Sequence, residues 1–239
     1  MGLHESDIPD KTVEVLARGF FKESLEYGFK KVDYLRFVNA LLDMAMSNNK
    51  KLEDNGHFVD DFKIDKNSPT PNFPLRGERV AIREFKSRDK KLLQKWVQDE
   101  AGRQFLLSRT TAQTIKIDNF VSDKACLIGI ITIDDNIPIG AVAFCDINKG
   151  QRRAELRKLI GETTERGKGY AKEATKLWLQ FGAQKLKLKK IYLGTLNTNI
   201  NNIRLNEELG FQVEGILRNE VYFDEQYHDL LRMGMFIED

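Results

Sequence analysis

The 239-residue sequence predicts an α/β protein of the α+β type, in which a helical N-terminal unit precedes a larger domain of strands and helices. Two observations predict this class. Before residue 49, apolar residues recur at the three- and four-residue spacing of a helix face, whereas from residue 79 alternating, strand-like segments are interleaved with helical ones. The expected parts are a helical hairpin over 1–50, a linker over 51–76 and a sheet-containing domain over 77–239.

Two amphipathic helices are expected in the first part. Pro9 and Asp10 are typical of a helix start, Gly28 interrupts the helical spacing, and Asp33 can cap a second helix. A helical hairpin has to bury its apolar stripe, so we expect it to pack on the larger domain or on a second copy of the chain, as structural support. The polar stretch that follows carries three prolines near its end, which is typical of a linker.

Strands and helices alternate in the third part. An apolar hairpin is expected where the strands 125–133 and 139–147 flank a turn at 134–136. The full expected order is a strand at 79–85, a helix capped by Ser87, a helix at 114–121, this hairpin, a strand from 154, a glycine turn, a helix reaching Phe181, a strand at 190–196, a helix at 199–209, and closing strands at 213–221 and 227–236.

Composition narrows the class of protein. A formal net charge of +2 is too small to indicate nucleic acid or an anionic membrane as a partner. No apolar run approaches the ~20 residues that span a bilayer, and the N-terminus lacks a basic and apolar signal, so a cytoplasmic protein is expected. The three histidines lack ligand spacing, so no metal site is expected, and Cys126 and Cys145 lie in apolar strands as free thiols.

The most informative stretch is the glycine turn between the strand from Ala154 and the following helix. Backbone N–H groups at a helix start have no internal partner and carry the positive end of the helix dipole, so they favour a pyrophosphate. Gly167 and Gly169 let that backbone approach closely, while Arg166 and Lys168 add positive charge. A P-loop is excluded because its Gly-x4-Gly-Lys-Ser/Thr pattern is absent, and the acid that a dinucleotide fold requires is missing from the next strand.

Two motifs resemble the GNAT superfamily of acyl-CoA-dependent N-acyltransferases. The run from Arg166 to Ala171, Arg-Gly-Lys-Gly-Tyr-Ala, is similar to the family's Arg/Gln-x-x-Gly-x-Gly/Ala signature, and an Asn-led helix from Asn199 ends in Gly210-Phe211. The similarity runs from about Arg79 to Phe236. It implies that 77–239 is an acyltransferase domain, with a mixed, mostly antiparallel sheet flanked by helices on both faces, and that acyl-CoA is the donor.

The resemblance also implies roles for single residues. The pyrophosphate would be held by the signature residues, and the pantetheine arm by the strand end before them and by Asn199. The residues expected to bind coenzyme A are Leu159, Ile160, Gly161, Arg166, Gly167, Lys168, Gly169, Tyr170, Ala171 and Asn199.

Glu155 is the candidate general base, because the amine has to lose a proton and the run Ala-Glu-Leu matches the run that carries the base in related histone acetyltransferases. The alternative is a glutamate that forms a salt bridge with neighbouring arginines. Asn206 stands where many relatives carry a tyrosine that protonates the departing thiolate. It either donates a hydrogen bond to the sulfur or is an uninvolved helix residue.

The acceptor is expected to be a small amine. Resemblance over 139–181 and 210–236 points to enzymes that acylate nucleotide-linked amino sugars of bacterial surface polysaccharides. Tyr227, His228 and Asp229 are similar to a run found near acceptor pockets. Alternatives are an acetyltransferase of ribosomal-protein or peptide N-termini, a polyamine acetyltransferase, and a non-catalytic acyl-CoA-binding module. A monomer or a homodimer is expected.

Overall fold

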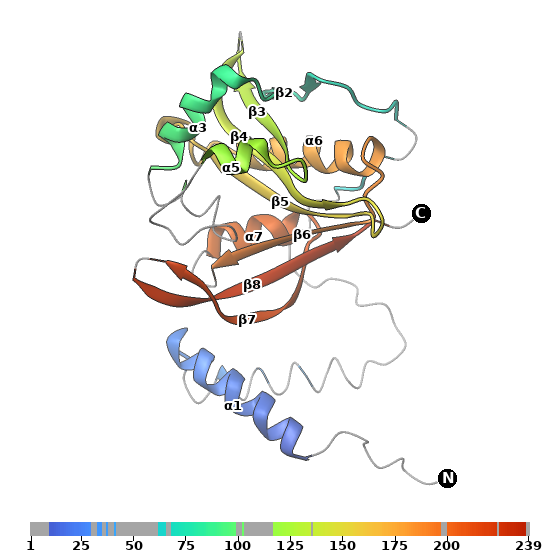
Figure 1. Ribbon diagram of the computed structural model, residues 1–239. Coiled ribbons are helices and arrows are strands. Elements are labelled where there is room, and N and C mark those ends of the chain that lie inside the picture. The colour runs from blue at the N-terminus through green and yellow to red at the C-terminus, as the bar shows by residue number, and fades with distance from the viewer. Residues whose placement is uncertain are drawn as a thin grey trace, which may run out of the picture. The chain divides into compact units, whose positions relative to one another are not determined.

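A computed structural model describes residues 10–29, 33–34, 37, 41, 62–65, 68–98, 102, 117–134, 136–196, 200–223 and 225–237. The chain divides into two compact units, Met1–His57 and Phe58–Asp239 (Figure 1). The division lies close to the first boundary expected from the sequence, whereas the three-part scheme with a separate linker stays a prediction.

The first unit contains helix α1, Asp10–Glu26. The helix ends as the sequence indicated: Gly28 has φ +73°, its N–H donates to the Leu25 carbonyl at 3.0 Å, and the N–H of Phe29 donates to the Ser24 carbonyl at 3.0 Å. Aromatic side chains meet beyond this turn, with the ring of Phe20 stacked 4.1 Å from that of Phe37. Most of the expected second helix lies outside the described residues.

The second unit is built on an eight-stranded sheet in the order β1-β2-β3-β4-β5-β6-β8-β7. All neighbouring pairs are antiparallel except β5 and β6, so the mixed, mostly antiparallel sheet is confirmed. The strands are β1 Leu75–Arg76, β2 Ala81–Glu84, β3 Leu127–Ile133, β4 Ile137–Asn148, β5 Arg153–Ile160, β6 Lys190–Leu196, β7 Gln212–Phe223 and β8 Gln226–Phe236.

Helices cover both faces of this sheet (Figure 1). On one face, α6 (Tyr170–Gln184) packs its buried Trp178 against Phe144 of β4, and α7 (Ile200–Glu208) lies beside β6. On the other face, α3 (Lys90–Trp96), preceded by the short helix η1 (Ser87–Asp89), and α5 (Ile117–Ser122) cover Ala141, Ala143 and Cys145. Alternate residues of β5 therefore enter two different cores.

The segment before the sheet is tied to α6. Gln184 donates from Nε2 to the carbonyls of Asp65 and Ser68, both at 2.8 Å, and the ring of Phe73 lies 5.0 Å from that of Phe181. This contact holds the chain against the outer side of α6 before it enters β1.

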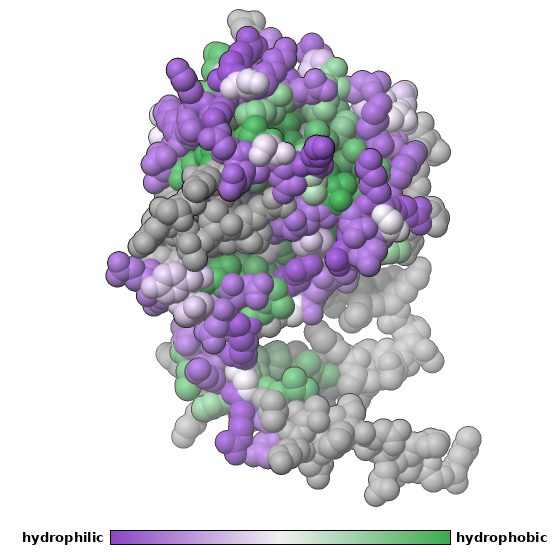
Figure 2. Space-filling model, in the orientation of Figure 1, coloured by the Kyte–Doolittle hydropathy of each residue, from purple (hydrophilic) through white to green (hydrophobic). Residues whose placement is uncertain are grey.

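The described surface is mainly hydrophilic, with apolar side chains visible over strands β3 and β4 (Figure 2). A search of the described helices for one with the length and hydropathy of a bilayer span finds none.

Candidate active site

The parallel strands β5 and β6 separate along their length. Among the described residues, they pair where Arg153–Glu155 meet Lys190–Tyr192, and the second half of β5 has no described strand partner on that side. Beyond this point β6 pairs with β8 alone, up to Leu196 opposite Leu230. The sheet is therefore open between the strand that leads into the glycine turn and the strand that leads into α7.

The glycine turn lies at the end of β5 and forms the start of α6. Gly167 has φ +77° and Gly169 has φ +84°, which are backbone conformations that residues with a Cβ rarely adopt. Gly167, Lys168 and Gly169 are exposed, and α6 begins directly afterwards at Tyr170 and Ala171. The first N–H groups of a 15-residue helix thus face an open turn, which is the geometry that suits a diphosphate.

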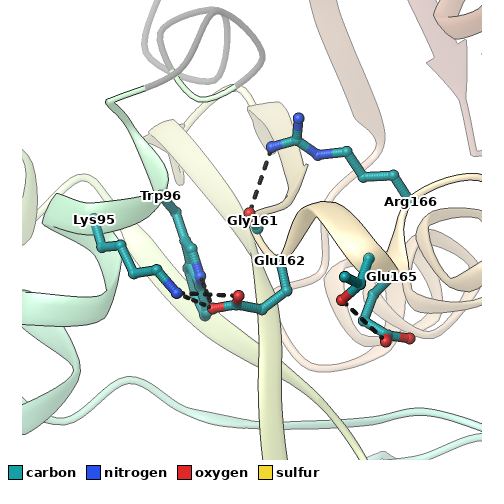
Figure 3. Close-up of polar contacts among 7 residues, drawn as sticks. Lys95, Trp96, Gly161, Glu162, Glu165 and Arg166 are labelled. Atoms are coloured by element: carbon teal, nitrogen blue, oxygen red, sulfur yellow. Dashed lines mark hydrogen bonds and ion pairs between the residues drawn. The ribbon is translucent and has the colours of Figure 1, made fainter.

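The side chain of Arg166 points back to the end of β5. Its Nε donates to the carbonyl of Ile160 at 2.9 Å, and its Nη2 lies 3.4 Å from the carbonyl of Gly161 (Figure 3). The guanidinium thereby joins the turn to the end of β5. On the outer side, Arg79 donates to the Lys168 carbonyl at 2.9 Å and lies 5.2 Å from the Tyr170 ring, so the turn is fixed from two sides.

Gly161 is required for a reason that the sequence did not indicate. A Cβ on Gly161 would lie 2.0 Å from Cγ of Trp96, because the indole packs directly on this backbone. Next to it, the indole Nε1 of Trp96 donates to Glu162 at 2.8 Å and Lys95 lies 2.9 Å from the same carboxylate (Figure 3). These two hydrogen bonds, chiefly that of Lys95, lower the pKa of Glu162. Helix α3 is thus anchored to the end of β5.

The two neighbours of Gly161 enter different cores. Leu159 is buried beneath α3 and α5, while Ile160 faces α6. The N–H of Gly161 donates to the Ile139 carbonyl at 2.8 Å.

Glu155 is 5% exposed and accepts a hydrogen bond of 2.8 Å from Arg157, which is 8% exposed. The salt bridge weighed from the sequence therefore exists, but it is buried and not on a solvated face. Both side chains lie on the α3 and α5 side of β5, and Glu155 is opposite Cys145 of β4.

Lys158 lies on the other side of β5 and was not singled out from the sequence. Its Nζ donates to Oδ1 of Asn206 on α7. Asn206 is fully buried, with its Nδ2 3.9 Å from the sulfur of Met233. Burial lowers the pKa of Lys158 from 10.5 to about 7. The sequence could have drawn attention to Lys158 as a lysine among apolar strand residues. It could not show the contact with Asn206, which is 48 residues away along the chain.

Tyr227, His228 and Asp229 lie at the hairpin end of β8, just before its pairing with β6 begins at Leu230. Tyr227 is 66% exposed, with its ring 5.1 Å from that of Tyr222. The Asp229 carboxylate accepts from the N–H of Asn219 at 2.8 Å, so it fixes the hairpin. Asn199 lies outside the described residues.

Within the described part of the chain, no group of three histidine, cysteine or acidic residues is arranged to hold a metal ion. Cys126 and Cys145 are free thiols, as expected, and Cys145 is buried. A hydrogen bond with Cys126, together with burial, raises the pKa of Cys145 far above its usual range, which makes it a poor nucleophile.

An open pair of parallel strands beside a glycine turn that starts a helix fits an extended ligand that carries a diphosphate. The chain belongs to the GNAT acetyltransferase family, because the family model for the acetyltransferase (GNAT) domain matches residues 79–212. The superfamily resemblance seen in the sequence is thereby confirmed.

Among curated proteins, the chain is 37% identical over 102 residues to spermidine N(1)-acetyltransferase of Escherichia coli (strain K12), covering 43% of this chain and 54% of that protein. It is 30% identical over 107 residues to a probable N-acetyltransferase of Bacillus subtilis (strain 168), covering 45% and 59%. The chain thus spans about half the length of these curated relatives.

Among solved structures, the spermidine N-acetyltransferase of Vibrio cholerae in complex with CoA and spermine superposes with a TM-score of 0.58 at 24% identity. The match covers 66% of this chain and 96% of that one. This likeness shows the fold.

Proposed function

We propose that the protein transfers an acetyl group from acetyl-CoA to the primary amine of a small molecule. The observation that carries this proposal is the exposed glycine turn at the start of α6, which follows the half of β5 that does not pair with β6. A diphosphate at the turn and an extended thioester arm in the gap would bring the acyl carbon to the middle of the sheet.

The residues of the turn fit the donor. The N–H groups from Gly167 to Ala171 would hold the pyrophosphate, with Lys168 adding charge. Arg166 would keep the turn in place through its bonds to the carbonyls of Ile160 and Gly161. Leu159, Ile160, Gly161 and Asn199 would border the pantetheine arm.

Glu155 is the proposed base for the acceptor amine. A primary amine with a pKa of ~8 to ~10 is mostly protonated at neutral pH, so a carboxylate that removes its proton would raise the rate. The bond from Arg157 keeps a fixed charge beside Glu155. Replacing Glu155 with Gln should lower kcat most at and below neutral pH, so that the rate rises more steeply towards the pKa of the amine, and an unchanged pH–rate profile would restrict Glu155 to a structural role.

For the acceptor, we propose a polyamine of the spermidine class. The support is that three of the matched curated proteins are named for spermidine acetylation. The nucleotide-linked amino sugar expected from the sequence resemblance finds no such support, and it becomes the main competitor in the test. A peptide N-terminus is the third acceptor class to be compared.

The test is acetyl transfer by the full chain to a panel of spermidine, a nucleotide-linked amino sugar and a short peptide, with products identified by mass spectrometry. Preferred acetylation of spermidine is the expected result. Preference for the amino sugar would reassign the acceptor class. Coenzyme A binding without transfer to any amine would favour a non-catalytic acyl-CoA-binding module.

A further inference from the structure

Lys158 and Asn206 face each other across the opening of the sheet. Lys158 belongs to the part of β5 that has separated from β6, where its backbone partner is Val142 of β4 on the other side. Asn206 belongs to α7, the helix that follows β6. The hydrogen bond from Lys158 Nζ to Asn206 Oδ1 therefore connects the two walls of the gap in which the donor thioester would lie.

The start of α6 lies next to this contact along the same side of the sheet. Lys172, in the first turn of α6, forms an ion pair of 2.9 Å with Glu208 near the end of α7. A donor anchored at the glycine turn would thus enter between α6 and α7 and reach the position of Lys158 and Asn206. Lys172 already has a carboxylate partner, whereas the described partner of Lys158 is a neutral amide.

The chemistry of Lys158 differs from that of a surface lysine. An ordinary lysine remains charged and is a weak acid at neutral pH. Burial lowers the pKa of Lys158 to about 7, so its ammonium is a stronger acid than a thiol with a pKa of ~8.5. Proton transfer from this ammonium to a thiolate is therefore favourable by about 1.5 pKa units.

We propose that Lys158 is a further catalytic residue, which protonates the thiolate released from acetyl-CoA while Asn206 holds its amine in position. This inference rests on the function proposed above. The amine nitrogen forms a bond to the acyl carbon, the carbon–sulfur bond breaks, and its electron pair goes to sulfur. Lys158 donates one proton to that sulfur. The new amide has released one proton, which recharges Lys158, so no further reactant is needed.

Asn206 acts as a positioning residue in this arrangement. Its amide oxygen accepts from Lys158 and its amide nitrogen lies near the sulfur of Met233, so the carboxamide is held from both ends. An amide cannot itself release a proton at neutral pH. Of the two roles considered from the sequence, a hydrogen bond to the sulfur or no involvement, the Lys158–Asn206 pair requires neither, because Asn206 acts on Lys158.

The first measurement compares Lys158→Met with Lys149→Met, a matched loss of one lysine in an exposed turn at the far end of β5. Loss of a general acid is expected to lower kcat by about 100-fold or more, with little change in the KM for acetyl-CoA. Lys149→Met should match the unaltered protein. A Lys158→Met variant with full kcat would overturn the proposal, and Lys158→Gln provides a second variant if the first fails to fold.

The second measurement needs no turnover. The ultraviolet absorbance of the thiolate reports the ionisation of enzyme-bound coenzyme A as the pH is raised. Because Lys158 has a pKa of about 7 and loses its proton before the thiol does, it should leave the bound thiol ionising near its ordinary pKa, whereas Lys158→Arg, which stays charged, should lower the pH of thiol ionisation by about one unit or more. Identical thiol titrations in the unaltered protein and Lys158→Arg would place Lys158 away from the sulfur and defeat the inference.

A third variant separates proton transfer from charge alone. Lys158→Arg keeps a positive group whose pKa is too high to release a proton at neutral pH. It should lower the pH at which the bound thiol ionises but should not restore kcat. Recovery of kcat would show that charge suffices and would overturn the role of Lys158 as an acid. Acetylation of Lys158 by acetyl-CoA alone, detected by mass spectrometry, would make it an acceptor and not an acid.

The two proposals fail in distinguishable ways. If the unaltered protein transfers acetyl groups but Lys158→Met is equally active, only the role of Lys158 falls. If the unaltered protein neither binds coenzyme A nor acetylates any amine of the panel, the proposed function and the role of Lys158 fall together.

Discussion

Strand β5 carries ionisable side chains that are buried on one face and partly buried on the other, and their partners differ between the two faces. On the side of α3 and α5, Glu155 and Arg157 form an ion pair of 2.8 Å. On the side of α6 and α7, Lys158 meets the neutral amide of Asn206. Opposite charges stabilise each other's ionised forms, whereas a neutral partner leaves most of the desolvation cost of an ammonium uncompensated.

The Glu155–Arg157 pair holds two opposite charges beside each other, whereas Lys158 can release its proton near neutral pH. A paired carboxylate and guanidinium keep their charges in a buried site only while both are present. A lysine with a pKa of about 7 exchanges its proton near neutral pH, which is what acid–base chemistry requires. The face of β5 that borders the opening towards α7 thus holds an ammonium that can release a proton near neutral pH.

The largest expected effect comes from breaking the ion pair. Arg157→Met should destabilise the protein by about 3–5 kcal/mol, because Glu155 would remain as a buried charge without this partner. Urea unfolding at pH 7 measures the loss. The double variant Glu155→Gln, Arg157→Met should recover much of the stability, and equal losses in the single and double variants would contradict the explanation.

On the side of β5 that faces α6 and α7, a substitution is expected to stabilise the protein. Lys158→Met should raise the free energy of unfolding at pH 7, by at most about 4 kcal/mol, because the buried amine is disfavoured in its charged form. The folded pKa of about 7 lies below the ordinary 10.5, so the penalty is complete below pH 7 and is lost as the pH rises towards 10.5. Thermal unfolding of both proteins between pH 7 and pH 10.5 measures this difference in stability. A stabilisation by Lys158→Met that does not shrink as the pH rises would contradict the explanation.

A smaller effect is expected where β5 ends. Gly161→Ala would place a methyl group 2.0 Å from Cγ of Trp96, and overpacking of this kind costs about 1–3 kcal/mol. Because Trp96 also holds Glu162, transfer activity should fall together with stability. Gly150→Ala is the control, since its Cβ would meet its nearest neighbour, Asn148, at 3.5 Å. Equal melting temperatures for the two variants would show that the indole can move aside.

The smallest effect concerns Glu173, which ties α6 to the chain before β2. Burial alone would raise its pKa, but hydrogen bonds from the N–H groups of Arg79 and Val80 and from the Arg79 side chain lower it. The stabilisation is therefore present above pH ~4.3 and is lost as the pH falls through the lowered value. Glu173→Gln should cost about 1 kcal/mol at pH 7 and nothing in acid. Glu220→Gln, at an exposed position, should be neutral at both.

Local features of the structure could be predicted from the sequence. The strand 190–196 has the bounds that its apolar pattern indicated, and the glycine turn ends where α6 begins. These succeed because strand alternation, helix spacing and the preference of glycine for positive φ depend on neighbouring residues. The order of the two motifs along the chain was sufficient to identify the superfamily.

The sequence by itself thus determined most of the described strands and helices, the glycine turn and the family. Only the tertiary structure decided which charges are buried and what each one meets: Arg157 beside Glu155, Asn206 beside Lys158, and Trp96 against Gly161. The physical reason is that a pKa and a steric limit depend on the atoms within a few ångströms. For Lys158 and Gly161, strand order and helix packing bring those atoms from positions 48 and about 65 residues away.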